Sequence, residues 1–340
     1  MVFGGTAFSQ EHSLSVSGGT EKIQYYFSGN YMGQEGMMAI RRDKLQRYSV
    51  SSKINAQLYP WLNMNYSMKY MRKDYSKPTA MTDNTLYQNI AKRWPMEPTV
   101  DPNGYPMGNT IIRPILYGGD NNSQTDWLYQ QFQVVIEPIK DWKIFGEINY
   151  KVIDAFTHTD YLKVPQMNVA GEPYSGDTWK TSKVTEGAER TNYFNANVYS
   201  EYYRSFADAH HLKAMVGFQA EVNKWRQLQA SKLDLISESV PSINAATGES
   251  TIDKSKLTHW ATAGFFGRLN YDYKERYLLE VNLRYDGTSR FAKDKRWNLF
   301  PSFSAGWNVA REAFMEPTSH IINTLKIRGS WGELGLSLIH

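Results

Sequence analysis

The stretch that decides the fold reads Tyr277-Leu278-Leu279-Glu280-Val281-Asn282-Leu283-Arg284-Tyr285-Asp286. From Tyr277 to Tyr285 every second residue is apolar, and the residues between them are mostly polar. Because successive side chains of a β-strand point to opposite faces of the sheet, this pattern predicts a strand with one apolar face and one polar face. Tyrosine closes the apolar row at both ends, which is typical of the aromatic girdles of an outer-membrane barrel.

The same alternation recurs along the chain and predicts about a dozen strands. It is clear in residues 47–58, 62–70, 142–152 and 211–223, where apolar side chains occupy alternate positions. A large antiparallel sheet with one solvated face produces the same pattern. Periodicity alone therefore leaves a soluble sheet and a transmembrane barrel open.

The connections between the predicted strands alternate strictly between short and long. Short turns are expected near 18–21, 59–61, 138–141, 205–210 and 272–276, and long polar loops at roughly 34–46, 72–126, 157–188, 224–258 and 286–297. Greek-key sandwiches mix connection lengths, whereas outer-membrane barrels join tight periplasmic turns to long extracellular loops. The sequence therefore predicts an all-β, antiparallel up-and-down transmembrane β-barrel, with one short helical stretch near 310–323.

The composition excludes several other classes of protein. The chain of 340 residues is 41% hydrophobic with a mean hydropathy of −0.55, and no run of about 18 apolar residues indicates a membrane helix. Aromatic residues make up 14%, which suits interfacial belts and sugar-binding surfaces. The absence of cysteine excludes disulfides and thiolate chemistry. The net charge of +4 is spread along the chain, so we expect no nucleic-acid partner.

Catalytic and metal-binding motifs are not recognisable in the sequence, and we expect neither an enzyme nor a cofactor. Adjacent histidines His210 and His211 on a strand point to opposite faces and make a poor metal site. A calcium-loop fragment is suggested by Asp120, Asn121, Asn122 and Asp126. The glycine and the final glutamate that a calcium-binding loop requires are misplaced in this sequence. The pattern therefore favours a polar loop cap.

Aromatic residues of the long loops are the candidate ligand-binding residues. They are Trp94, Tyr105, Tyr117 and Trp179. Such rings can stack on sugars or aromatic ligands. Packing within the loops, or membership of a girdle, is the favoured alternative for each.

Three stretches resemble the SusC/RagA family of TonB-dependent outer-membrane transporters. The first is the hairpin of residues 12–36, with its Ser17-Gly18-Gly19-Thr20 turn. The most specific is Arg284-Tyr285-Asp286-Gly287-Thr288-Ser289-Arg290-Phe291, followed by Phe300-Pro301-Ser302-Phe303-Ser304-Ala305-Gly306-Trp307. The third is Leu325-Lys326-Ile327-Arg328-Gly329-Ser330-Trp331-Gly332-Glu333-Leu334-Gly335. In the family, Asp286-Gly287-Thr288 would lead a strand into an extracellular loop, and Phe300-Pro301 would start the return strand.

The resemblance also implies a domain organisation. Residues 1–335 would form about 12 strands of a 22-stranded barrel, without plug or signal peptide, and residues 336–340 would be an off-pattern end. The start of the chain, Met1 to Gly5, lacks the basic and apolar regions of a signal peptide. We therefore expect an internal piece of a larger protein.

The function implied by the resemblance is import of oligosaccharides or peptides across the outer membrane. A SusD-like surface lipoprotein would cover the extracellular loops, above all 72–126 and 157–188. TonB would act through an N-terminal region outside this chain, and outer-membrane lipid would surround the barrel. Lumen-facing positions would be Asn63, Asn65, Lys69, Gln131, Gln133, Glu147 and Asn149. A siderophore or cobalamin receptor, and a secreted β-sandwich carbohydrate-binding module, are the alternatives.

Overall fold

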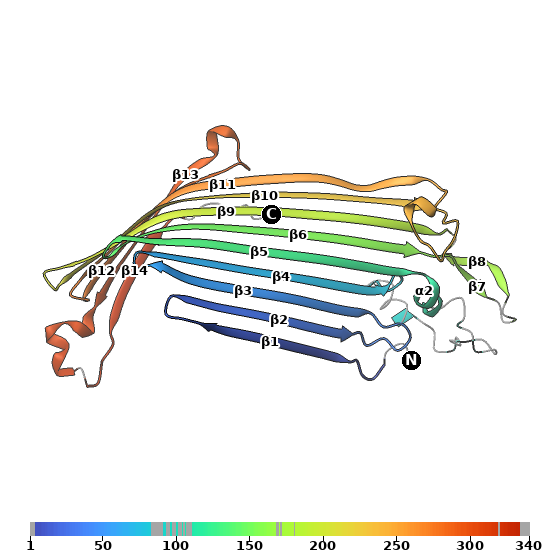
Figure 1. The fold of residues 1–340 in the computed structure, drawn as a ribbon, viewed down its shortest axis with the longest axis horizontal. Coiled ribbons are helices and arrows are strands. Elements are labelled where there is room, and N and C mark those ends of the chain that lie inside the picture. The colour runs from blue at the N-terminus through green and yellow to red at the C-terminus, as the bar shows by residue number, and fades with distance from the viewer. Residues whose placement is uncertain are drawn as a thin grey trace.

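The computed structural model describes residues 4–82, 91–92, 96, 100, 104, 106, 111–167, 170, 172–179, 181–318 and 320–333, and for residues 166–167 and 173–179 the backbone alone. Most of these residues form one antiparallel sheet of 12 strands (Figure 1). Its strands, in sheet order, are β1 (Ser9–Gly19), β2 (Ile23–Glu35), β3 (Lys44–Tyr59), β4 (Leu62–Pro78), β5 (Asp120–Ile139), β6 (Trp142–Tyr161), β9 (Lys183–Phe206), β10 (His210–Leu233), β11 (Ser250–Tyr273), β12 (Tyr277–Thr288), β13 (Trp297–Asn308) and β14 (Lys326–Gly332).

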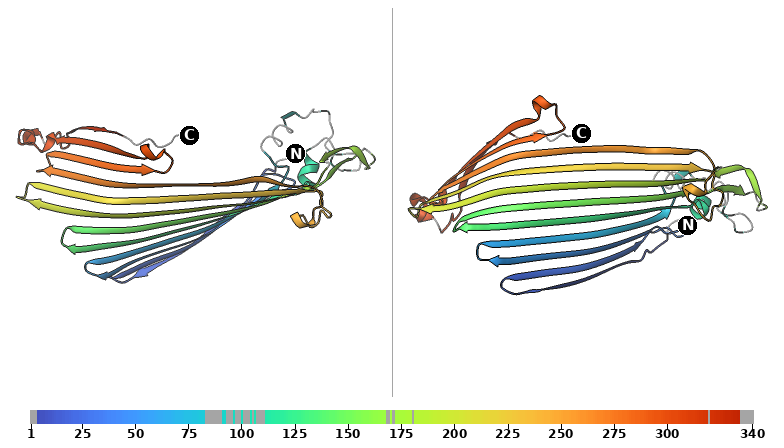
Figure 2. Two further views of the ribbon diagram at one scale, coloured as in Figure 1. Left: turned by 90° about the horizontal axis from the view of Figure 1, so that it is seen from above. Right: turned by 45° about the horizontal axis from the view of Figure 1, so that its top comes forward.

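The strands lie side by side in the order in which they occur in the chain, which confirms the predicted up-and-down topology. Between β6 and β9, a separate hairpin forms from β7 (Val164–Met167) and β8 (Pro173–Trp179). Figure 2 shows the large sheet as a single curved layer. Apart from that hairpin, the described residues form no second sheet, so the β-sandwich alternative is wrong. The sheet is open, with β1 at one edge and β14 at the other.

The two faces of the sheet differ in polarity, as the alternation predicts. On the apolar face, Val216, Phe265 and Leu283 remain 65%, 55% and 45% exposed. Most buried apolar residues of the described chain instead lie at the loop end, in the clusters Met38, Ala80, Ile115 and Val184, Leu235, Ala246. Apolar surface in water costs roughly 25 cal/mol per Å². The apolar face is therefore suited to contact lipid.

The apolar band is staggered from strand to strand. On β4 the apolar row ends at Tyr70, and on β12 it ends at Tyr285. Following the register partners from β12 back to β4 brings Tyr285 to the row of Met64 rather than Tyr70. The band thus steps down by about one residue for each strand crossed, as tilted strands require when they close into a barrel. This stagger keeps the band level within a membrane.

Five short turns join strands at one end of the sheet, close to the predicted positions. They comprise residues 20–22, 60–61, 140–141, 207–209 and 274–276. Paired positive φ angles occur at Ala207 (52°) and Asp208 (47°), and at Lys274 (52°) and Glu275 (53°). Two consecutive residues in this conformation match the right-handed twist of the strands on either side. These predictions are confirmed.

The long loops lie at the other end, but their predicted extents, 34–46, 72–126, 157–188, 224–258 and 286–297, are wrong. The strands continue, and the connections are 36–43, 79–119, 162–182, 234–249 and 289–296. Above the apolar band apolar residues become isolated, as at Phe156, Leu228 and Leu257, so the regular alternation is lost. Pairing with neighbouring strands nevertheless satisfies the backbone there, and the strands persist.

The helices whose full extent lies within the described residues are few and short. They are α2 (Ile112–Tyr117) and the 3₁₀ turns η1 (Ile243–Ala245), η2 (Lys293–Lys295), η3 (Val309–Arg311) and η4 (Ala313–Thr318). Within the described residues, no helix is both long and apolar enough to cross a membrane.

The connection 309–325 between β13 and β14 lies at the short-turn end, so the strict alternation of connection lengths is wrong here. Its turns η3 and η4 correspond to the helical stretch predicted near 310–323. Glu312 anchors it by accepting hydrogen bonds from Trp307 Nε1 at 2.9 Å and Arg276 Nη1 at 3.3 Å. The bonds from Trp307 and Tyr277 lower the pKa of Glu312. The anchor therefore works best with Glu312 ionised.

We predict that the isolated chain does not form a stable barrel. Its edge strands β1 and β14 each have a neighbour on one side only. Each unpaired backbone group costs several kcal/mol in hydrocarbon, so the chain should aggregate or stay unfolded in detergent. Gel mobility before and after heating is the measurement. Heat-modifiable mobility of these residues alone would contradict the prediction.

A second prediction concerns Glu312 in the complete receptor. A lowered folded pKa contributes stability above the unfolded pKa of about 4.3, and this contribution is lost as pH falls through the folded pKa. Glu312→Gln should lower the hydrogen-exchange protection factors of 309–325 at neutral pH and remove the pH dependence of those protection factors. The control is Glu238→Gln at the opposite end. Equal protection in E312Q and wild type at pH 7 would refute the anchor.

Candidate functional site

A ladder of amide side chains crosses the polar face of the sheet from β3 to β9. The Nδ2 of Asn65 donates to Gln133 Oε1 at 3.1 Å, and the Nε2 of Gln131 donates to Glu147 Oε1 at 3.0 Å. Asn149 donates to Glu147 at 2.6 Å and to Asn195 at 3.3 Å. The predicted lumen residues Asn63, Asn65, Gln131, Gln133, Glu147 and Asn149 all take part. Lys69 lies on the same face, as register partner of Ser51 and Tyr129.

Three further residues, which were not among the predicted lumen residues, belong to the ladder. Asn55 bonds to Asn65, and Asn197 donates to Asn195 at 2.9 Å. Asn195 is only 5% exposed. All three occupy polar positions of the period-two pattern. That pattern alone would have predicted that they face the lumen. The ladder is neutral apart from Glu147 and can bind polar ligands through donors and acceptors alike.

An aromatic and cationic belt lies on the same face, next to the ladder on its loop side. Successive register partners Tyr129, Lys151 and Tyr193 form part of it, and Trp260 lies two strands further on. The ammonium of Lys151 stands 5.1 Å from the ring centre of Tyr193, and the guanidinium of Arg290 stands 4.8 Å from that of Trp260. Aromatic rings beside cations suit flat or polar ligands. These rings occupy polar positions of the alternation, so the sequence pattern gives no sign of them.

A cavity of about 720 Å³ opens on this face across β10 to β13. Its lining includes Glu221, Thr262, Arg284, Asp286 and Arg290. Glu221 accepts from the hydroxyls of Tyr193 at 2.5 Å and Thr262 at 2.7 Å. The volume falls in the usual range of ligand sites, and its polar groups are carboxylates, hydroxyls and guanidinium groups.

The motif of residues 284–307 shapes this cavity. Arg284 Nε and Nη2 donate to Asp286 at 2.9 and 3.1 Å. Thr288 ends β12, so the predicted exit into a loop is confirmed. The predicted strand start at Phe300-Pro301 is wrong, because β13 begins at Trp297. Pro301 is tolerated inside the strand because its carbonyl accepts from Glu333, on the β14 side, so the missing N–H removes no bond to β12.

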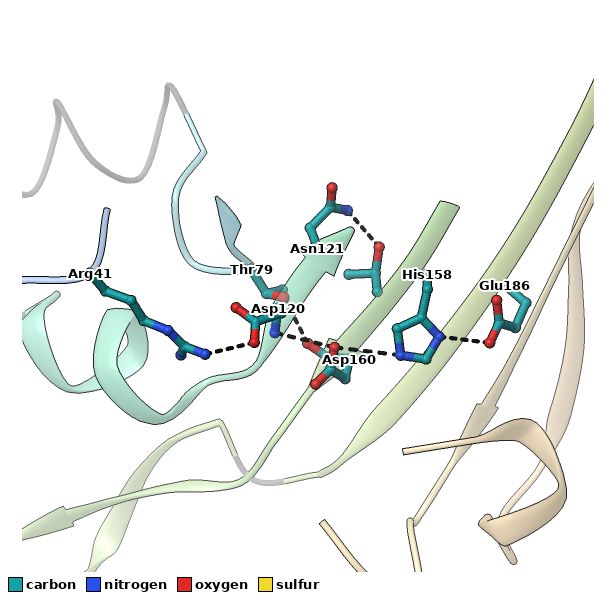
Figure 3. Close-up of polar contacts among 8 residues, drawn as sticks. Arg41, Thr79, Asp120, Asn121, His158, Asp160 and Glu186 are labelled. Carbon is teal, nitrogen blue, oxygen red and sulfur yellow. Dashed lines mark hydrogen bonds and ion pairs between the residues drawn. The ribbon is translucent and has the colours of Figure 1, made fainter. Parts of the chain in front are cut away.

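A second polar cluster holds the loop end together (Figure 3). Arg41 Nη2 contacts Asp120 Oδ2 at 2.7 Å and its Nη1 donates to the carbonyls of Ile115 and Leu116, at the end of α2. The backbone N–H of Asp120 donates to Asp160 at 3.2 Å. His158 reaches Glu186 at 2.6 Å. The cluster therefore fixes α2 and the connection 36–43 to β5, β6 and β9.

Asp160 is the buried member of this cluster. It is 7% exposed, and burial raises the pKa of its carboxyl group. The hydroxyl of Thr79 donates to its carbonyl at 2.7 Å, and His158 Nε2 lies 3.7 Å from its carboxylate. Every named group has a partner within the protein, so this cluster supports the loops rather than a reaction.

The four predicted ligand-binding aromatics are not brought together by the described structure. Trp94 and Tyr105 lie outside the described residues. Tyr117 ends α2, is 50% exposed and has the guanidinium of Arg113 at 5.4 Å from its ring centre. Trp179 is the last residue of β8, with the backbone of Val164 as its partner. Their role stays a prediction.

The two metal-site candidates have other roles. His210 stacks on Phe206 at 4.9 Å, whereas His211 approaches Ser205 on the other face at 2.8 Å. The supposed calcium loop is part of strand β5, and Asp120 and Asp126 pair with Arg41 and Arg72. Within the described ranges, no group of three or more metal-ligating side chains is arranged to hold an ion.

One curved sheet with an apolar outer face, a polar inner face and alternating turn and loop ends defines the class of this protein as an outer-membrane β-barrel. The chain belongs to the family described as TonB dependent receptor-like, beta-barrel, which matches residues 62–334. Its place is therefore the outer membrane.

Two curated relatives match nearly the whole chain. TonB-dependent receptor P39 of Formosa agariphila is 25% identical over 335 residues, covering 95% of this chain and 30% of the relative. TonB-dependent receptor SusC of Bacteroides thetaiotaomicron is 26% identical over 361 residues, covering 97% of this chain and 34% of SusC. The chain thus spans about a third of the length of these relatives, which bears out the resemblance to the SusC/RagA family.

Solved structures agree on the fold. The RagAB peptide importer in its closed-closed state superposes with a TM-score of 0.78 at 19% identity, covering 97% of this chain and 37% of the importer chain. The FpvAI–pyocin S2 complex superposes with a TM-score of 0.52 at 12% identity, covering 88% and 39% of the two chains.

The amide ladder predicts a cost for removing its most buried member. In the complete receptor, Asn195→Leu should lower the free energy of unfolding by about 1–3 kcal/mol, because Asn149 and Asn197 lose their acceptor. Urea unfolding in detergent measures it. The control is Asn298→Leu, which removes one exposed bond to the Lys295 carbonyl. Similar midpoints for both variants would contradict the ladder's role.

Proposed function

We propose that the chain forms about half of the wall of a 22-stranded TonB-dependent transporter that imports oligosaccharides or peptides. Residues 1–335 would be the barrel part, and residues 336–340 would be an off-pattern end. Plug and signal peptide would belong to other segments of the receptor. The observation that carries the proposal is the continuous inner wall, where an amide ladder borders an aromatic and cationic belt.

The chemistry of this wall supports uncharged or weakly charged polar ligands. Amides such as Asn65 and Gln133 offer donors and acceptors to sugar hydroxyls and peptide groups alike. Rings such as Tyr193 and Trp260 offer stacking surfaces, and Arg290 already stacks on Trp260. The match to SusC over 97% of this chain favours a transporter of the SusC/RagA kind over a siderophore or cobalamin receptor.

The two ends of the sheet support the proposed partners. The loop end carries the large connections 79–119 and 162–182, which offer the surface that a SusD-like lipoprotein would cover. The turn end faces the periplasm, where TonB would pull on the plug. We assign no catalytic role, because the carboxylates Glu147, Glu221 and Asp286 are engaged in hydrogen bonds with neighbouring side chains.

Deletion of residues 79–119 in the complete receptor should abolish uptake or lipoprotein binding. The barrel should stay intact, because β4 ends before this segment and β5 begins after it. A Gly-Ser linker replaces the segment. Growth on oligosaccharides or peptides as sole carbon source, and co-purification of the lipoprotein, are measured. Heat-modifiable mobility confirms folding. Unchanged uptake with unchanged lipoprotein binding would refute the proposal.

A point substitution tests the inner wall itself. Trp260→Ala should reduce uptake about three- to tenfold, the equivalent of one lost aromatic contact. Trp260→Phe keeps a ring and should retain most of the uptake. Trp331, exposed on β14, gives the matched control Trp331→Ala on the apolar face. Unchanged uptake in Trp260→Ala, with uptake lost only in the control Trp331→Ala, would contradict a role of the belt.

A further inference from the structure

A line of charged side chains crosses the apolar face where the apolar band ends on the loop side. Register pairing places five of them in one row, Arg72, Asp126, Asp154, Arg190 and Arg226, on β4, β5, β6, β9 and β10. Each is separated from the apolar residues of its strand by an even number of positions, so its side chain points to the same, outer face. Because the band is staggered, the row begins directly above Tyr70 on β4 and stands four residues above Phe194 on β9 and Val222 on β10. The long loops mark the extracellular end, so its β9–β10 end lies on the headgroup side of the outer leaflet.

The acidic residues of this row are each matched by an arginine. Arg72 Nε and Nη2 donate to the two carboxylate oxygens of Asp126 at 2.7 Å. Asp154 lies opposite Asp126 and is 3.6 Å from Arg190 Nε. The part of the row that lies on β4 to β9 is therefore balanced in charge.

The remaining cations have no such match. Arg226 lies directly opposite Arg190 in the β9–β10 ladder. Lys224 precedes Arg226 on the same face, with His259 as its partner on β11. Among the described residues, neither Lys224 nor Arg226 forms an ion pair, and both side chains are exposed. Like charges directly opposite each other in a sheet are destabilising, so this arrangement favours an anion between them.

The apolar band continues directly below these cations. Val222 is the next outward residue on β10, and Phe194 is its register partner on β9. Phe194 is 42% exposed. An anion bound here would thus sit at the top of a lipid-facing surface. The ligand that fits is amphiphilic, with a phosphate at headgroup level and acyl chains along the band.

We propose that Lys224 and Arg226, beside the Arg190–Asp154 pair, form a binding site for the phosphate groups of a phosphorylated glycolipid of the outer leaflet. The guanidinium groups offer forked donors to phosphate oxygens, and Lys224 adds a point charge. The site is independent of the transported substrate, because it faces away from the inner wall. It fixes the height of β9 and β10 in the membrane.

The test uses the complete receptor in phosphatidylcholine nanodiscs, titrated with Kdo2-lipid A and followed by native mass spectrometry. Lys224→Gln/Arg226→Gln should bind the glycolipid roughly thirty-fold more weakly, since each basic group near a membrane surface contributes about 1 kcal/mol. The control, Lys22→Gln/Lys140→Gln, removes two exposed charges from the turn end and should bind as wild type does. If the double variant does not fold, Lys224→Gln alone should weaken binding about fivefold.

Three results would overturn the proposal. The first is equal binding by the folded charge variant and wild type. The second is equal affinity of wild type for phosphatidylglycerol, which would show a response to membrane charge in general. The third is displacement of the glycolipid by millimolar inorganic phosphate, which would identify a site for a free anion.

Discussion

Pairing of every backbone group inside a layer without water is the constraint on which this structure depends. Hydrocarbon offers no hydrogen-bond partners, so each strand that crosses it needs a neighbour on both sides. Backbone pairing runs through the sheet from β1 to β14. Its register shifts, at Gln57/Tyr59, Ile136/Ile139 and Gln229/Ala230, fall at or beyond the limits of the apolar band. Within the band the pairing is regular, and the period of two then fixes which side chains meet lipid.

From this constraint follows a division between the two faces. The outer face carries apolar side chains, and its charges begin only where the band ends, at Arg72, Arg190 and Lys224. The inner face is free of that requirement and carries the amide ladder, the aromatic and cationic belt and the cavity near Arg284. Neighbouring residues of one strand thus serve different purposes, since one contacts the membrane and the next faces the ligand. Changes on one face can leave the other unaltered.

The sequence reveals most of the fold and part of the site. Strand positions and faces were predictable, because a slip of one residue would turn the row of Tyr277 to Tyr285 away from lipid. Strand ends were not, because the polar continuations of β9 and β10 lack alternation and are held by their neighbours. Polar residues such as Asn65 and Glu147 were assigned to the inner face. The meeting of Tyr193 with Glu221, or of Arg190 with Arg226, depends on long-range register that no local pattern encodes.

The central claim is that alternate residues of these strands face lipid. Single cysteines placed along β12 of the complete receptor, within a stretch that has none, can carry a fluorophore quenched by brominated acyl chains. The account predicts strong quenching at Val281 and Leu283 and weak quenching at Glu280 and Asn282. Equal quenching at all four positions, or strong quenching at Glu280 and Asn282 alone, would contradict it.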